Sequence, residues 1–386
     1  MNIKMLKQNA REYGMYIALL VIMVLFTILS GGVFMSPRNL SNLFDQTGYV
    51  AVLAVGMTLI LIIRHIDLSV GFVAGFIGAI AAVLMRMGNV PLVFVFIIAI
   101  AVGIVIGLYH GWLVAFMGVP AFVVSLASMF IFRGALLRLT EGSGTIIVTN
   151  KFFNALGNGF IPDIFNISGT HVLTLIIGVV AIIAFIINEI RTREKRKKYN
   201  FETSTLDMFI GKLVFISLLI LFFAWQLAQY RGISWTVVIV IVIVAIYHFF
   251  MNNTVLGRHI YAIGGNPEAA ELSGIKVKAV TMFVFASMSA LAALAGILYT
   301  ARLQSATTTA GNGFELDAIA SAYVGGVSAS GGVGKVTGTI IGAIVMSSLS
   351  NGMNLLGVGI SYQYIVRGLV LVIAVLFDVR SRRVKI

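Results

Sequence analysis

The chain has 386 residues, of which 59% are hydrophobic and only 11% are charged, with a formal net charge of +13. About a quarter of the residues of an ordinary soluble domain are charged, so this composition excludes a soluble globular protein and indicates a polytopic membrane protein. The chain contains no cysteine, which excludes disulfides, thiolate metal sites and cysteine nucleophiles.

The apolar runs predict the membrane-spanning segments in chain order. The first run follows a basic tail and does not end in a small-residue cleavage site, so we expect a span and not a cleaved signal peptide. Since a span needs roughly 20 apolar residues, the expected fold is all-α with about 10–12 transmembrane segments. The candidates are 14–34, 48–64, 66–87, 91–112, 119–138, 171–189, 209–229, 232–250, 279–300, 315–330, 336–352 and 355–377.

The basic residues gather between spans, in the N-terminal tail, in RTREKRKK (191–198) and near the C-terminus. Loops that retain Lys and Arg are cytoplasmic. Alternation from a cytoplasmic N-terminus places 139–170 outside and 190–208, 251–278 and the C-terminus inside, in agreement with the charges. We interpret 191–198 as an orientation signal, with a site for anionic lipid or a partner as the alternative. This placement favours a lipid bilayer, and no nucleic acid, as the partner of the positive charge.

We expect a single transmembrane domain over 1–386. Its expected parts are a cytoplasmic tail 1–13, an N-terminal half 14–189, an inserted basic loop with two spans 190–250, a cytoplasmic loop 251–278, a C-terminal half 279–377 and a cytoplasmic tail 378–386.

Two apolar segments are interrupted by polar residues, HIDLSVGFVAG (65–75) and FELDAIASAYVGGVSASGG (314–332). Broken helices in corresponding places of two halves indicate a transport site at the interface of an inverted repeat. Asp67 either caps a helix expected to begin at Leu68 or lines the pathway. The candidate pathway residues are Asp67, Ser69, Glu315, Asp317, Asn351 and Asn354.

Paired glycines predict close helix packing in three spans, because they let backbones approach. These pairs lie in GFVAG (71–75), GIVIG (103–107) and GTIIG (338–342).

The sequence offers no support for an enzyme. SGGVGKVTG (330–338) resembles a phosphate-binding loop, but Ala329 and Val336 occupy the positions that require Gly and Ser or Thr. The five histidines show no metal-ligand spacing. We therefore expect no metal and no cofactor bound by this chain, and energy for uphill transport would come from an ion gradient or a partner.

A polar stretch, GRHIYAIGGNPEAAELSGIKV (257–277), interrupts the apolar spans and predicts a short capped helix. Asn266 suits the N-cap, Pro267 the first turn and Gly274 a left-handed C-terminal cap. Glu268 favours the positive end of the helix dipole. Such a helix has about seven residues and roughly 10 Å, so packing must stabilise it. It is either a structural surface helix or a knob that docks on a cytoplasmic partner.

This stretch closely resembles the cytoplasmic coupling loop in permease subunits of bacterial ABC importers for simple sugars. VGMTLILIIRHIDLSVG (55–71) and FELDAIASAYVGGVSASGGVGKVTGTIIGA (314–343) are also similar to that family, and QYRG (229–232) and SNGMNLLGVGISYQYIVRG (350–368) resemble its xylose-type branch. The chain departs at Arg64 and His65, where many members have small residues.

The resemblance implies a non-catalytic, multi-pass permease of the bacterial inner membrane that imports a monosaccharide, with D-xylose as the expected cargo. It implies a cytoplasmic ATPase that binds ATP and Mg, an extracytoplasmic sugar-binding protein and a second permease copy in a homodimer. The residues expected to couple to the ATPase are Gly264, Gly265, Asn266, Pro267, Glu268, Ala269, Ala270, Leu272 and Gly274.

Two alternatives to this function stay open. The same scaffold could carry another monosaccharide, a nucleoside or a branched-chain amino acid. The more distant alternative is an ion-coupled secondary transporter, in which Asp67 with Glu315 or Asp317 would serve as the intramembrane acids.

Overall fold

The structure is a computed structural model that describes residues 10–88, 90–142, 144–165, 169–199, 201 and 205–383. Parts of both expected tails (1–9 and 384–386) and of the basic loop 190–208 lie outside the described residues. The larger helices are α2 (Ala10–Leu29), α3 (Pro37–Ile62), α4 (Val70–Arg86), α5 (Leu92–Ala115), α6 (Ala121–Thr140), α8 (Val172–Lys198), α9 (Leu206–Ala228), α10 (Trp235–Asn253), α13 (Val277–Leu303), α15 (Val336–Leu355) and α16 (Ile360–Arg383). The shorter elements are η1 (Val33–Met35), β1 (Thr145–Ile147), α7 (Lys151–Asn158), α11 (Val255–Gly265), α12 (Pro267–Leu272), β2 (Ser305–Thr307) and α14 (Phe314–Val324).

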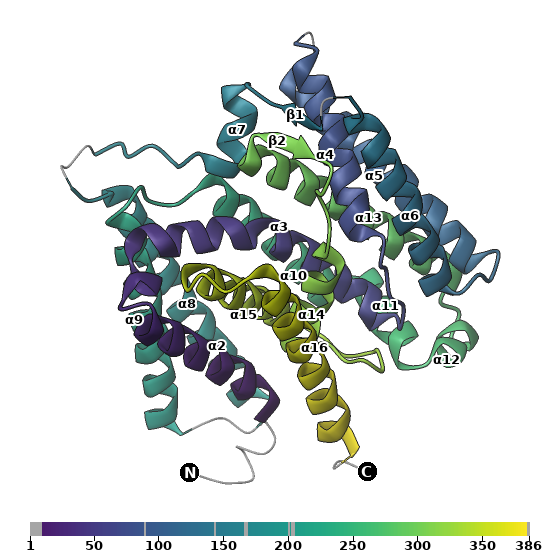
Figure 1. Cartoon of the computed structure of the whole chain (residues 1–386). Coiled ribbons are helices and arrows are strands. Elements are labelled where there is room, and N and C mark those ends of the chain that lie inside the picture. Colours follow the sequence, from purple (N-terminus) through teal and green to yellow (C-terminus); the bar gives the residue numbers. More distant parts are fainter. Residues whose placement is uncertain are drawn as a thin grey trace. The chain divides into compact units, whose positions relative to one another are not determined.

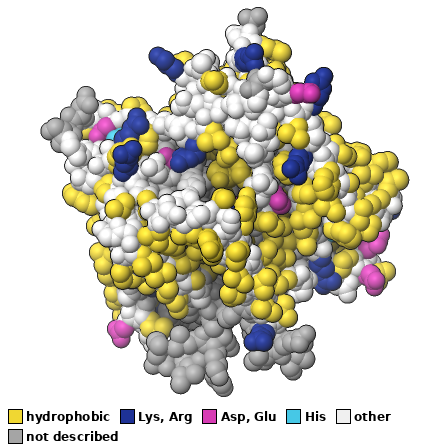
Figure 2. All heavy atoms as spheres, in the orientation of Figure 1, with side chains coloured by type: hydrophobic (Ala, Val, Ile, Leu, Met, Phe, Trp, Pro, Cys, Tyr) yellow, Lys and Arg dark blue, Asp and Glu magenta, His cyan; other side chains and the backbone are white. Residues whose placement is uncertain are grey.

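The prediction of an all-α polytopic membrane protein is confirmed. Among the described residues, nine helices are long and apolar enough to cross a membrane, and Gly14–Leu29 and Val70–Arg86 are shorter apolar helices. Many of these helices are exposed along their apolar length. In α9 and in α16, only 6% of an 18-residue apolar stretch is buried. Figure 2 shows hydrophobic side chains over much of one face, with charged side chains sparse on it. Such a surface suits a lipid environment.

Several expected spans have different limits in the structure. Helix α3 begins at Pro37, well before the expected 48, because Pro at the first helical position starts a polar first turn that the hydropathy pattern does not register. Helix α4 begins at Val70 and not at Leu68, since 63–69 are irregular. The expected span 315–330 is wrong as a full span: α14 ends at Val324, before the glycine-rich segment 325–335.

The chain forms two compact units. Unit 1 consists of 1–34, 43–159 and 235–386, and unit 2 consists of 35–42 and 160–234. Unit 2 contains α8 and α9, joined through an ion pair in which Lys212 Nζ lies 2.8 Å from Glu189 Oε2. Gly178 of α8 faces Ala224 of α9, so these two helices pack closely. Unit 2 overlaps the expected insertion 190–250 but has different limits, and α10 belongs to unit 1.

The centre of unit 1 is α13, which packs against α4 and α5 (Figure 1). Gly103 and Gly107 of α5 face the backbone of α13 at Ser289 and Phe285, and a Cβ at either glycine would overlap backbone atoms. The prediction of close packing through the paired glycines is confirmed here. It is also confirmed for 71–75, which faces the backbone at 310–311, and for 338–342, which faces the backbone at Ser321 and Gly325.

Different elements lie at the two ends of α13. At its C-terminal end, β2 pairs antiparallel with β1, with Ile146 opposite Ala306. At its N-terminal end lie α11 and α12, which contact α13 (Figure 1). A helix of 27 residues is about 40 Å long, so the strand pair and the short polar helix lie at opposite ends. Parts of the expected segments 139–170 and 251–278 therefore lie at opposite ends of α13.

Candidate functional site

The polar stretch forms two consecutive helices, α11 and α12, where the sequence predicted one. Thr254 caps α11, since its side chain accepts a hydrogen bond from Gly257 N. Asn266 belongs to both helices. Its backbone N–H donates to Ala262 O of α11, and its Oδ1 accepts from Ala269 N of α12 at 3.1 Å. One extended residue therefore ends the first helix and starts the second.

The C-terminal end of α12 is closed by a Schellman motif around Gly274, whose φ is +83°. Gly274 N donates to Glu271 O at 2.9 Å, and Ile275 N donates to Ala270 O at 3.1 Å. These two bonds satisfy carbonyls that have no partner inside the helix. The caps expected from the sequence at Asn266, Pro267 and Gly274 are thus present, on a helix of six residues.

Helix α12 presents one side to the protein and the other to its surroundings. Ala270 is 5% exposed, whereas Leu272 is 90% exposed. Glu268, Ala269 and Glu271 are also exposed. Both ends of α12 are capped and Ala270 packs against the protein, so the exposed Leu272 is held outward and is available to a partner. Of the residues expected to couple, Gly264 is buried instead, where the backbone of Ile62 and Gly332 leaves no room for a Cβ.

The two interrupted segments, 65–75 and 314–332, are called the first and the second polar break. Asp67 lies in the first break and is fully buried. Its Oδ1 accepts hydrogen bonds from Ser69 N at 2.9 Å and from Ser69 Oγ at 2.6 Å. This turn leads into α4 at Val70, so one carboxylate oxygen orients the start of the helix. Within the described part of the chain, Asp67 Oδ2 has no hydrogen-bond partner, and the same holds for both ring nitrogens of buried His110.

The second break meets the first. Gly71, in the first turn of α4, lies against Gly311 and against Glu315 in the first turn of α14. The N-terminal ends of two helices are therefore side by side, and both ends carry the positive pole of a helix dipole. Asp67, Glu315 and Asp317 are acidic residues at these two ends. Half-helix N-termini that converge in this way form the ion and substrate sites of many transporters.

Asp317 of α14 forms an ion pair with Arg367 of α16, with Nη1 3.2 Å from Oδ2. The side chains are 11% and 23% exposed, so this pair is largely shielded from solvent. Sequence reasoning missed Arg367, although a single basic residue inside an apolar span is a signal for a functional or paired group.

The two asparagines expected in the pathway have different environments. Asn351 is buried within α15. Asn354 is exposed near the end of α15, and its Oδ1 accepts a hydrogen bond from Gln363 Nε2 at 2.7 Å. Gln363 Nε2 also donates to Val358 O, so these residues fix the turn between α15 and α16. Asn354 thus has a structural role in this turn.

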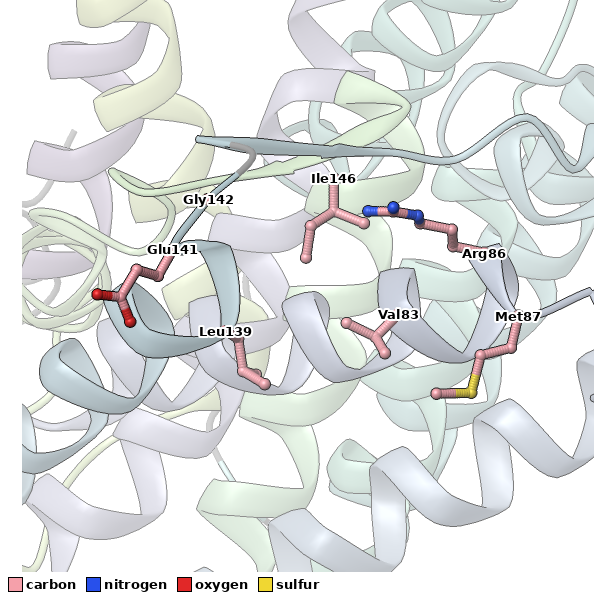
Figure 3. Close-up of a pocket in the computed structure, with 7 residues that line it drawn as sticks. All are labelled: Val83, Arg86, Met87, Leu139, Glu141, Gly142 and Ile146. Atoms are coloured by element: carbon pink, nitrogen blue, oxygen red, sulfur yellow. The ribbon is translucent and has the colours of Figure 1, made fainter.

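A separate hollow of about 500 Å³ lies at the far end of α4, away from the polar breaks. Figure 3 shows Arg86 and Met87 from the end of α4, Leu139 and Glu141 from the end of α6, and Ile146 of β1 around it. Glu141 points away from Arg86 in this view and pairs with Arg138 instead. The hollow is open and holds no cluster of polar groups comparable to the breaks.

Residues 39–375 match the family model described as branched-chain amino acid transport system / permease component. The chain belongs to this family. The permease is 38% identical to a xylose transport system permease protein of Haemophilus influenzae over 380 residues, 98% of this chain and 99% of the relative. It is 37% identical to a xylose transport system permease protein of Escherichia coli K12 over 375 residues, 97% and 93% of the two chains.

The permease is also 35% identical to a ribose import permease protein of Escherichia coli K12 over 368 residues, 95% and 93% of the two chains. No solved structure matches the permease. The resemblance to permease subunits of sugar importers is confirmed by these relatives, which it matches over nearly its whole length. The permease is therefore a multi-pass membrane transport component.

Proposed function

We propose that the permease is the membrane subunit of an ATP-driven importer of D-xylose. The observation that carries this proposal is the match of 37–38% identity, over nearly full length, to two xylose transport system permease proteins. The permease itself binds no nucleotide in this proposal. ATP and Mg are bound and used by a separate cytoplasmic ATPase, an extracytoplasmic binding protein delivers the sugar, and two permease copies form a homodimer.

Helix α12 is the element that contacts the ATPase in this proposal. Its support is geometric: both ends are capped, Ala270 anchors it to the protein, and Leu272 is 90% exposed at its last turn. A large apolar side chain held outward on a rigid helix suits a pocket on a partner, where such anchors contribute most of the binding energy. Glu268 stands beside it at the positive helix end and adds charge specificity.

The sugar path runs through the meeting point of the two breaks. There, Asp67, Ser69, Glu315 and Asp317 provide polar groups in an apolar bundle, and the ends of α4 and α14 converge. Release into the cytoplasm requires weak binding, so several hydrogen-bonding groups along the path suit this function better than one tight site. The xylose specificity resides mainly in the binding protein.

A reconstituted complex tests the cargo and the coupling together. Permease, ATPase and binding protein in proteoliposomes should import xylose when ATP is supplied on the ATPase side, and ribose at least tenfold more slowly. Faster import of ribose, of a nucleoside or of a branched-chain amino acid would assign the permease to that cargo. Import into ATPase-free vesicles under a pH gradient would favour an ion-coupled transporter, for which the buried Asp67 and Glu315 are the candidate acids.

Docking of α12 is tested by Leu272→Ala and Glu268→Lys. Neither side chain is buried, so both variants should fold and reach the membrane. We expect each to reduce co-purification of the ATPase, because truncation of an interface anchor commonly costs about 2 kcal/mol or more. Co-purification at the wild-type level in both variants would leave α12 as a structural surface helix.

In this proposal the permease lies in the inner membrane of a bacterium. The retained basic residues place both termini, 190–208 and 251–278 in the cytoplasm. The cysteine-free chain permits single-cysteine labelling at exposed Lys151 and Lys198. An impermeant thiol reagent added to intact cells should label Lys151→Cys and spare Lys198→Cys. The opposite pattern would invert the topology.

A further inference from the structure

Arg64 occupies a position where the backbone favours glycine. It follows the end of α3 with φ +65°, one of two non-glycine residues with positive φ in the described part of the chain. Arg64 N donates to Leu61 O and His65 N donates to Ile60 O, both at 3.0 Å. This is a Schellman motif with arginine at the left-handed position, which is usually glycine because a Cβ strains it. Backbone strain of this kind is concentrated at functional sites, where the surrounding contacts maintain it.

The guanidinium of Arg64 reaches the end of α11, two hundred residues later in the chain. Nε donates to Gly264 O at 2.7 Å, and Nη2 donates to Gly265 O. These are the last two carbonyls of α11, which have no partner within the helix, and they lie at the negative pole of its dipole. Asn266, which starts α12, follows directly. Arg64 is thus bonded to the residues that immediately precede the ATPase-docking helix.

The glycine-rich segment after α14 joins the same contact. Ile62 O, at the end of α3, accepts a hydrogen bond from Gly332 N at 2.9 Å, and Tyr261 of α11 donates from its hydroxyl to Gly334 O at 2.8 Å. Gly331 lies so close to the Arg64 side chain that a Cβ at Gly331 would overlap it. Three segments therefore meet at Arg64: the end of α3 directly before the first break, the glycine-rich segment 325–335 that contains the end of the second break, and α11.

We propose that Arg64 is the positioning residue through which movement of α12 reaches both polar breaks of the sugar path. The two hydrogen bonds from a planar guanidinium hold the end of α11 at a fixed distance and angle from the end of α3. A displacement of α12 by the ATPase then moves Arg64, which is three residues before Asp67, and the segment 325–335, which directly follows α14. This inference rests on the proposed docking of α12 and adds the residue that transmits it.

Arg64→Gly is the informative variant. Glycine adopts φ +65° without strain, so the variant removes the guanidinium and leaves the end of α3 in its native conformation. Gln304→Gly is the matched control, because Gln304 is the other described non-glycine residue with positive φ. It follows the C-terminal end of α13, next to the β1–β2 pair, whereas α11 lies at the N-terminal end. Both variants relieve the same kind of backbone strain, and only one removes the link.

Sugar import and ATP hydrolysis are measured together in proteoliposomes that contain the whole complex. We expect the sugar imported per ATP hydrolysed to fall at least tenfold in Arg64→Gly and to stay at the wild-type value in Gln304→Gly, with equal recovery of assembled complex and no loss of thermal stability. A ratio within twofold of wild type in Arg64→Gly, or an equal fall in Gln304→Gly, would overturn the inference. A wild-type complex whose hydrolysis does not respond to sugar would instead refute the proposed function.

A second measurement follows the transmission itself. A non-hydrolysable ATP analogue bound to the ATPase should alter amide hydrogen exchange at 266–276, 63–70 and 325–335 in the wild type. In Arg64→Gly the change at 266–276 should persist, while the changes at 63–70 and 325–335 should be lost. Equal changes at all three segments in both proteins would show that Arg64 is not the link.

Discussion

The left-handed residue that closes α12 offers a test in which only backbone conformation differs between variant and control. Gly274 has φ +83°, and no heavy atom lies within 4 Å of the position of an added Cβ. Gly274→Ala therefore introduces backbone strain without a clash. Gly265→Ala is the control, because Gly265 also has open space around it but is the last residue of α11 and does not have a positive φ.

The expected magnitude follows from the backbone alone. A left-handed conformation costs an L-residue about 1–2 kcal/mol, and alanine recovers roughly 0.4–1 kcal/mol by restricting the unfolded chain. The net destabilisation of the Gly274 cap is about 1 kcal/mol, which corresponds to roughly a fivefold shift toward the frayed helix. Helix α12 has only six residues, so its own backbone hydrogen bonds are too few to offset this loss. Gly265→Ala should instead stabilise α11 by up to about 1 kcal/mol.

Hydrogen exchange of the peptide 266–276 in the purified permease measures this shift. In Gly274→Ala, the amides that close the cap, at positions 274 and 275, should exchange about fivefold faster than in the wild type, and stimulated ATP hydrolysis in the full complex should decline. Gly265→Ala should leave that exchange unchanged or slow it. If exchange at 274 and 275 is unaffected by Gly274→Ala, or rises equally in both variants, the Schellman cap does not determine the stability of α12.

Three further predictions concern the interior of unit 1. Asp67→Asn should keep sugar transport within a few-fold of wild type, because asparagine can accept the same bonds at the start of α4, and collapse of transport in an assembled complex would assign a role to the charge. Asp317→Asn or Arg367→Gln alone should lower the free energy of unfolding by about 3–5 kcal/mol, and the double variant should recover most of this loss. A double-mutant cycle of thermal unfolding measures the coupling, and additive losses would contradict a coupled pair. Gly107→Ala should destabilise by about 1–3 kcal/mol because backbone atoms fill the space of the added methyl, whereas Gly134→Ala, in open space on α6, should not; equal melting temperatures would refute tight packing at Gly107.

Patterns that depend on neighbouring residues were predictable from the sequence. Hydropathy predicted the long spans, since a bilayer requires a continuous apolar run whatever the tertiary arrangement. The caps of α12 at Asn266 and Gly274 were predicted because a helix end is determined by hydrogen bonds within a few residues. The packing of Gly103 and Gly107 was predicted for a similar reason, although their partners on α13 were not.

Contacts between distant segments were decided by the tertiary structure alone. Nothing in the sequence near Asp317 indicates that Arg367 will pair with it, since the partner is fixed by how α14 packs on α16. Arg64 appeared only as a departure from a family pattern, and its meaning depends on carbonyls at Gly264 and Gly265 that the fold brings to it. Local hydrogen bonds and apolar patterns depend on short stretches of sequence, whereas the contact of two interrupted segments with the end of α11 requires the whole chain to be folded.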